Sequence, residues 1–176
     1  MKTINYLTLF LVIYVTSLRA EAPKSLDPNY RLDLFVDNSM VSTPVGCTID
    51  HSGRLLVIES HTHFRPDGYK GPETDRILAF TDTNGNGKAD KVETYYLGGT
   101  HTMSITNAGK HSTLVATRGE IYRLDDLNKD GTADLKTEII KLETEGNYPH
   151  NGLCGLVLTS DNSKLYFGFG ENLGKD

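Results

Sequence analysis

The sequence predicts an all-β fold built from repeated units of about four strands. Short apolar runs, separated by Gly, Asp, Asn and Pro, are typical of strands joined by turns. Two similar aspartate-rich loops begin at Asp82 and Asp126, 44 residues apart. No segment after residue 20 shows the 3.6-residue periodicity of an amphipathic helix. A fixed repeat of ~40–50 residues with four strands in each unit is typical of a β-propeller.

The first 20 residues are predicted to be a secretory signal peptide. Lys2 gives a positive start, residues 6–15 are apolar, and Ala20-Glu21-Ala22 has the form of a cleavage site. The apolar run is too short to cross a bilayer. We therefore expect an exported protein, periplasmic or extracellular. An uncleaved anchor that associates with the membrane is the alternative.

The charge of the chain is acidic and has no basic block. Removal of residues 1–20 takes away Lys2 and Arg19, so that the net charge changes from −5 to −7. Nucleic-acid binding depends on clustered cations that neutralise phosphates. The sequence therefore argues against a nucleic-acid partner.

The two cysteines, Cys47 and Cys154, each follow a glycine on an apolar run. This setting favours two small, buried core residues. A disulfide is the alternative, because an exported chain can pair its cysteines. The sequence has no C-x-x-C-H motif and therefore no site for covalent haem attachment.

The first repeat follows a polar lead-in at 21–29, and the partial propeller domain is predicted over 30–176. Residues 30–36 alternate between apolar and polar side chains, as a half-buried strand does. A long polar loop spans 60–74, and the first aspartate loop begins at Asp82. The strands of this part are predicted at 30–36, 45–49, 55–59, 76–80 and 92–97.

The second and third repeats follow the same order. Strands are predicted at 102–105, 113–117, 121–124, 137–142, 153–158 and 165–169. About two and a half blades are thus present, whereas propellers close with ~4–8 blades. Since stacked repeats need neighbours to bury their faces, we expect the remaining blades to come from a longer chain or from other copies.

The two aspartate loops are candidate Ca²⁺ sites, because alternate oxygen side chains on a Gly-centred loop converge on a hard cation. The second loop has Thr137, not Glu, at its twelfth position. An Asx-rich turn without metal is the alternative, since Asp, Asn and Gly all favour turns. The candidate ligands are Asp82, Asn84, Asn86, Asp90 and Glu93 in the first loop, and Asp126, Asn128, Asp130 and Asp134 in the second.

His61 and His63 form an H-x-H pair near Glu59, and His101 begins the next repeat. On an extended segment the two side chains point to one side, which suits a metal. Two ligands do not make a zinc site. A polar rim of a central channel is the alternative.

The segment 145–172 is predicted to form a hairpin with polar groups at one end. His150 and Asn151 precede the strand 153–158, and Glu171 follows the strand 165–169. The two ends of a hairpin lie together, so an imidazole and a carboxylate are expected to meet at the rim of a sheet. A histidine that only caps the strand is the alternative.

Several stretches resemble known quinoprotein families. The hairpin resembles that of soluble quinoprotein glucose/sorbosone dehydrogenases. The whole of 28–176 more closely resembles the membrane-bound dehydrogenase family of PVC type. The stretches that carry this resemblance are ESHTHF, DRI, TMS, ATR, EIYRL, LETEGNYPHNGL and YFGFGENLG.

The resemblance implies a six-bladed propeller that oxidises a sugar or alcohol hydroxyl with pyrroloquinoline quinone. His150 would take the hydroxyl proton as general base, with a pKa near neutrality. Asn151 would bind cofactor or substrate, and Glu171 would orient the imidazole. The family's cofactor-binding residues lie on later blades, so none is assigned here.

A non-catalytic propeller is the other class of function that the sequence allows, since a fold does not fix an activity. It would bind carbohydrate or a protein partner, with calcium only as a structural staple.

Overall fold

A computed structural model describes residues 22–143 and 152–170. All regular structure in these residues is β-strand, and no helix there is long and apolar enough to cross a membrane. The chain divides into two compact units, 1–33 and 34–176. The described part of the first unit, 22–33, is exposed and contains turns but no strand. The predicted signal peptide lies outside the described residues.

The described residues of the second unit form ten strands. They are β1 (Pro44–Ile49), β2 (Leu55–Glu59), β3 (Asp75–Thr81), β4 (Lys91–Gly99), β5 (Thr102–Asn107), β6 (Ser112–Thr117), β7 (Glu120–Asp125), β8 (Leu135–Lys141), β9 (Leu153–Leu158) and β10 (Leu165–Phe169).

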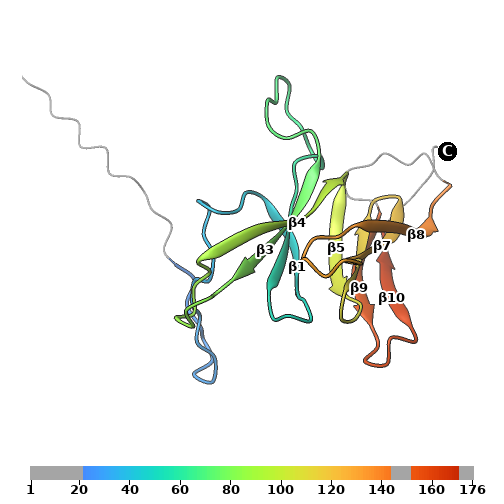
Figure 1. Cartoon of the computed structure of the whole chain (residues 1–176). Coiled ribbons are helices and arrows are strands. Elements are labelled where there is room, and N and C mark those ends of the chain that lie inside the picture. Colours follow the sequence, from blue (N-terminus) through green and yellow to red (C-terminus); the bar gives the residue numbers. More distant parts are fainter. Residues whose placement is uncertain (1–21, 144–151, 171–176) are drawn as a thin grey trace, which may run out of the picture. The chain divides into compact units, whose positions relative to one another are not determined.

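These strands form three antiparallel sheets, none of which is closed (Figure 1). The first two sheets have the same plan, with strand orders β1-β2-β3-β4 and β5-β6-β7-β8, and the third pairs β9 with β10. Within each sheet, each strand pairs with the next in the sequence. The all-β fold and the repeated four-stranded unit are thus confirmed.

The core lies between successive sheets. One cluster joins Leu56 and Ile58 of β2 to Val115 of β6 and Tyr122 of β7. The next cluster joins the other face of the second sheet to Leu153 of β9. The inner strands are therefore buried on both faces, which explains why they are continuously apolar rather than alternating.

The predicted strand at 30–36 is wrong. Residues 30–36 form no strand, and Tyr30 and Leu34 are 71% and 66% exposed. The Phe35 carbonyl does accept a hydrogen bond from the Ala89 N–H at 2.9 Å. An alternating pattern specifies a strand only when a partner strand covers its apolar side, and no such ladder forms here.

The cysteine prediction is also wrong for Cys47. Both cysteines are free, Cys47 is exposed and Cys154 is half-buried. Residues on β1 point alternately to opposite faces, and the thiol of Cys47 lies on the more exposed face. The flanking Gly46 and Thr48 do not specify which face is covered. The alternative of a disulfide is not realised.

Candidate functional site

The first two sheets bring their polar strand ends together at one place. Glu59 ends β2, Asp75 begins β3, Thr102 begins β5 and Thr117 ends β6. The Thr102 N–H donates to Asp75 Oδ2 at 2.9 Å, which joins the two sheets at this end. We call it the histidine end, because it carries His61, His63 and His101.

Asp75 is the centre of the histidine end. It is 1% exposed, and its Oδ1 accepts the N–H groups of His61 and Thr62 at 2.6 and 2.9 Å. Its Oδ2 accepts the Thr62 hydroxyl at 3.0 Å as well as the Thr102 N–H. The Thr62 hydroxyl in turn accepts the His101 N–H. This carboxylate therefore fixes the loop 60–74 against the start of β5.

Glu59 is a second buried carboxylate and orients His61. Its Oε1 accepts Arg76 Nε and contacts His61 Nε2, both at 2.6 Å, and its Oε2 accepts the Ser42 N–H at 2.9 Å. Burial acts to raise the pKa of Glu59, but hydrogen bonds from Arg76, Ser42 and His61 outweigh it and lower that pKa. An ionised carboxylate thus holds the imidazole in one orientation.

The two histidines of the H-x-H motif both contact protein groups. His61 Nδ1 lies 2.9 Å from the Tyr69 hydroxyl, so that both ring nitrogens are engaged. His63 Nδ1 lies 3.3 Å from Arg118 Nη2, a cationic neighbour. Within the described residues no three His, Cys, Asp or Glu side chains are grouped to hold a metal. Whether these histidines line the rim of a central channel stays a prediction.

His101 lies at the opening of this end. Its backbone is left-handed, with φ of 51°, and it lines a cavity of about 370 Å³ with Arg118 and Lys141. Burial and the Arg118 charge lower the pKa of His101. The neutral imidazole is therefore the form that the folded chain favours.

His101 should make the chain less stable in mild acid. Since its folded pKa is below the unfolded value of about 6.5, protonation favours the unfolded chain. Stability is fully present above pH ~7 and is lost as the pH falls through ~6.5 toward the folded pKa, by less than about 1 kcal/mol because the ring is partly exposed. His101→Asn, which tolerates positive φ, should remove this loss.

The measurement is urea unfolding of wild type and His101→Asn at pH 7.5 and 5.5. His51→Asn, at an exposed turn, controls for the loss of an imidazole elsewhere. If His101→Asn and wild type lose equal stability on acidification, His101 does not have this role.

The first aspartate loop lies at the other end of the sheets and is closed by its own hydrogen bonds. Asp82 accepts the N–H groups of Gly85 and Gly87, both at 2.7 Å, and Asp90 accepts that of Thr83 at 3.0 Å. The Thr83 backbone and hydroxyl lower the pKa of Asp90. The side-chain oxygens of Asn84 and Asn86 each accept the N–H of the residue two positions later, Asn86 and Lys88. Glu93 pairs with Lys91 at 2.9 Å.

The second aspartate loop has the same construction. Asp134 accepts the N–H groups of Leu127 and Asn128, and Asp130 accepts that of Thr132 at 2.8 Å. Asn128 accepts the Asp130 N–H at 2.9 Å, and Asp126 accepts that of Gly131 at 3.0 Å. Both loops thus have the hydrogen bonds that the Asx-turn alternative requires. Calcium binding stays a prediction.

The predicted catalytic residues His150, Asn151 and Glu171 lie outside the described residues. Gly152 follows Asn151 directly and is described. A side chain at Gly152 would lie 2.5 Å from Arg118 Cα, so its backbone packs tightly on the histidine end. The hairpin itself is confirmed as β9 and β10, with Gly152 O accepting the Gly170 N–H at 3.1 Å.

Residues 20–176 match the family described as "Domain of unknown function (DUF7133)". The chain belongs to this family. No curated protein is significantly similar to it.

One solved structure is distantly similar to the DUF7133 chain. It is the "Iodide structure of Trichoderma reesei Carbohydrate-Active Enzymes Family AA12", with 16% identity and a TM-score of 0.47. The match covers 73% of this chain and 31% of that chain. A likeness of this extent carries no inference about function.

Sequence reasoning missed two residues of the DUF7133 site. Asp75 stands between a polar loop and an apolar strand, so it looks like an ordinary loop residue, and its partner Thr102 is 27 residues away. Tyr69 stands among loop residues and gains significance only from its contact with His61. An acidic residue directly before a buried strand was the one available signal for Asp75.

Proposed function

We propose that this DUF7133 chain forms blades of an exported β-propeller oxidoreductase that oxidises a sugar or alcohol hydroxyl at the histidine end. The observation that carries the proposal is the packing of Gly152, two residues after His150, on Arg118. Arg118 donates to the His63 carbonyl at 2.8 Å and shares a cavity with His101. The two four-stranded sheets with apolar layers between them support the blade assignment.

The chain's own residues would divide the work between proton transfer and positioning. His150 would take the proton of the substrate hydroxyl, Asn151 would donate to substrate or cofactor, and Glu171 would orient the imidazole. Asp75 and Glu59 keep the surrounding loop in place through the hydrogen bonds described above. The remaining blades of a longer chain, or other copies, would complete the site and cover the exposed Phe169.

Pyrroloquinoline quinone would supply a two-electron acceptor when bound. The carboxylates of this quinone need cationic partners, and the cavity beside His101 offers Arg118 and Lys141. These two side chains would face the carboxylates and hold the cofactor's anionic groups. They make up part of a binding site, and other blades would provide the rest.

Dye-linked oxidation tests this function. The intact natural protein that contains this sequence would be loaded with pyrroloquinoline quinone and Ca²⁺ and given a panel of sugars and alcohols. His150→Ala should lower the rate about 10²–10⁴-fold, the usual contribution of a general base. His51→Ala, an exposed histidine on the β1–β2 turn, should leave the rate unchanged. Absence of any oxidation, or full activity in His150→Ala, would contradict the proposal.

A non-catalytic, calcium-stapled propeller that binds carbohydrate or a protein partner is the second candidate. The observation that favours it is the shared construction of the two aspartate loops, each of which gathers several side-chain oxygens into one short turn. In this case the metal would stabilise the strands β3–β4 and β7–β8 that the loops connect.

Calcium should raise the melting temperature of the chain if these loops bind it. Binding to the folded state alone stabilises by about 2.7 kcal/mol at a ligand concentration of 100 times Kd. We expect a rise of several degrees between EGTA and millimolar Ca²⁺, reduced in Asp82→Ala. Asp67→Ala, an exposed aspartate on the loop 60–74, is the control. Identical melting curves with and without Ca²⁺ would show that calcium does not stabilise these loops.

A further inference from the structure

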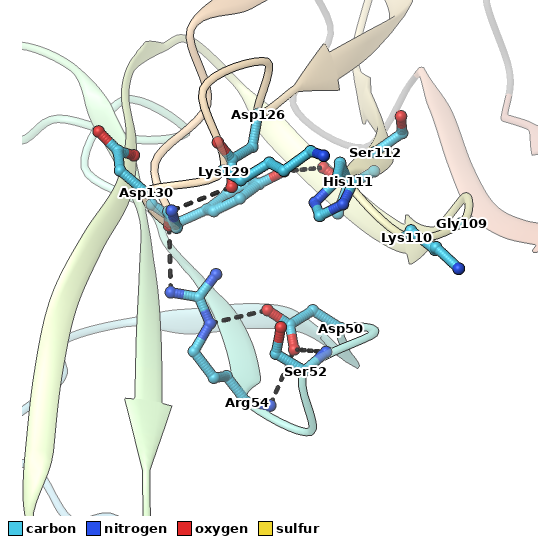
Figure 2. Close-up of a pocket in the computed structure, with 13 residues that line it drawn as sticks. Asp50, Ser52, Arg54, Gly109, Lys110, His111, Ser112, Asp126, Lys129 and Asp130 are labelled. Atoms are coloured by element: carbon cyan, nitrogen blue, oxygen red, sulfur yellow. Dashed lines mark hydrogen bonds and ion pairs between the residues drawn. The ribbon is translucent and has the colours of Figure 1, made fainter.

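We infer that a cavity at the end of the sheets opposite the histidine end binds a small hydroxylated anion, a polyol that carries one carboxylate or phosphate group. Three turns surround this cavity, at 50–54, 109–113 and 126–131 (Figure 2). Its volume is about 250 Å³, less than the ~300–1,000 Å³ of pockets for drug-sized ligands. The inference does not depend on hydroxyl oxidation at the histidine end.

Asp126 supplies a buried acceptor in the wall of the cavity. It is 7% exposed, its Oδ2 accepts the Gly131 N–H at 3.0 Å, and its Oδ1 is buried without a hydrogen-bond partner among the described residues. A buried carboxylate oxygen is almost always paired in native proteins. We therefore expect a ligand in the cavity to donate a hydrogen bond to Asp126 Oδ1.

Two lysines at the opening also have no partner in the described part of the chain. Lys110 and Lys129 are exposed, and neither ammonium makes an ion pair or hydrogen bond with the described residues. Figure 2 shows their side chains on separate turns of the cavity wall. The third cation, Arg54, is already engaged, since it donates to Asp50 at 2.8 Å and to the Gly131 carbonyl at 3.1 Å.

This arrangement selects among classes of ligand. The lining contains three cations and also three carboxylates, Asp50, Asp126 and Asp130. A neutral hydroxyl is therefore the donor to Asp126 Oδ1 that leaves this charge balance unchanged. The two exposed ammonium groups are available to an anionic acceptor on the same molecule. A neutral sugar would leave the lysines unused, and a simple anion would leave Asp126 unpaired.

Calorimetric titration of the whole chain tests this binding. Gluconate and glucose 6-phosphate are the probes, and they distinguish a carboxylate from a phosphate source of the anionic group. Glucose, inorganic phosphate and CaCl₂ are the comparisons. We expect at least one probe to bind at least tenfold more tightly than glucose and inorganic phosphate.

Variants assign the binding to this cavity. The exposed double variant Lys110→Ala/Lys129→Ala should keep the fold and weaken the bound probe at least tenfold, and Asp126→Asn should weaken it by a similar factor. Lys88→Ala, an exposed lysine on the first aspartate loop, is the matched control and should bind normally.

Three results would overturn the inference. They are no binding of either probe at millimolar concentration, binding that the lysine double variant leaves intact, and Ca²⁺ binding that Asp126→Asn abolishes while neither probe binds. The last result would assign the Asp126 oxygen to a metal.

Discussion

Asp75→Ala is expected to lower the free energy of unfolding by about 3–5 kcal/mol, since it leaves several buried donors unpaired at once. The carboxylate accepts four hydrogen bonds, from the backbone of His61, Thr62 and Thr102 and from the Thr62 hydroxyl. No neighbouring group can replace it, because the site is closed to solvent at 1% exposure. Urea unfolding with an unchanged m-value would measure the loss.

Two further variants separate the charge from the contacts. Asp75→Asn retains the shape but turns one acceptor into a donor that faces other donors, so we expect a smaller loss of about 2–3 kcal/mol. Asp67→Ala, on the exposed part of the same loop, should stay within about 0.5 kcal/mol of wild type. If Asp75→Ala is as stable as Asp67→Ala, Asp75 does not fix the loop.

Gly152→Ala is expected to cost about 2–4 kcal/mol, from backbone strain and overpacking together. The residue has φ of 143°, and a Cβ there would lie 2.5 Å from Arg118 Cα and 3.0 Å from Arg118 O. These neighbours are backbone atoms, which cannot rotate away as a side chain would. The start of β9 must therefore move away from the second sheet.

Gly119→Ala is the matched control for this change. Gly119 follows Arg118 directly, a Cβ there meets nothing within 4 Å, and its φ is not left-handed. Urea unfolding should separate the two variants by at least about 1.5 kcal/mol. In the intact protein Gly152→Ala should also reduce hydroxyl oxidation, because His150 is two residues away in the sequence. Equal stability of the two variants would mean that β9 tolerates displacement.

The positions of the strands could be read from the sequence with little error. The bounds of β2, β9 and β10 agree with those expected, because each is a short apolar run between turn residues. The stretch 30–36 had an equally good pattern and failed. A strand needs a partner, and whether a partner lies alongside is not a local property.

The aspartate loops were recognised for the same local reason. The hydrogen bonds of Asp82 reach three to five residues along the chain, so the spacing of Asp, Asn and Gly is enough to specify the turn. Glu93 fitted the calcium pattern by position, yet on β4 it pairs with Lys91. Because Glu93 is part of strand β4, the pleat of the strand and not the conformation of the loop sets the direction of its side chain.

The sequence by itself determined the all-β class and the repeat of four strands, since these depend on residues close together in the chain. Tertiary structure alone decided which polar groups meet. Asp75 and Thr102 are 27 residues apart, Thr62 and His101 are 39 apart, and Arg54 and Gly131 are 77 apart. Such contacts arise only when apolar layers pack one sheet on the next, and that packing placed Asp126, Lys110 and Lys129 around one cavity.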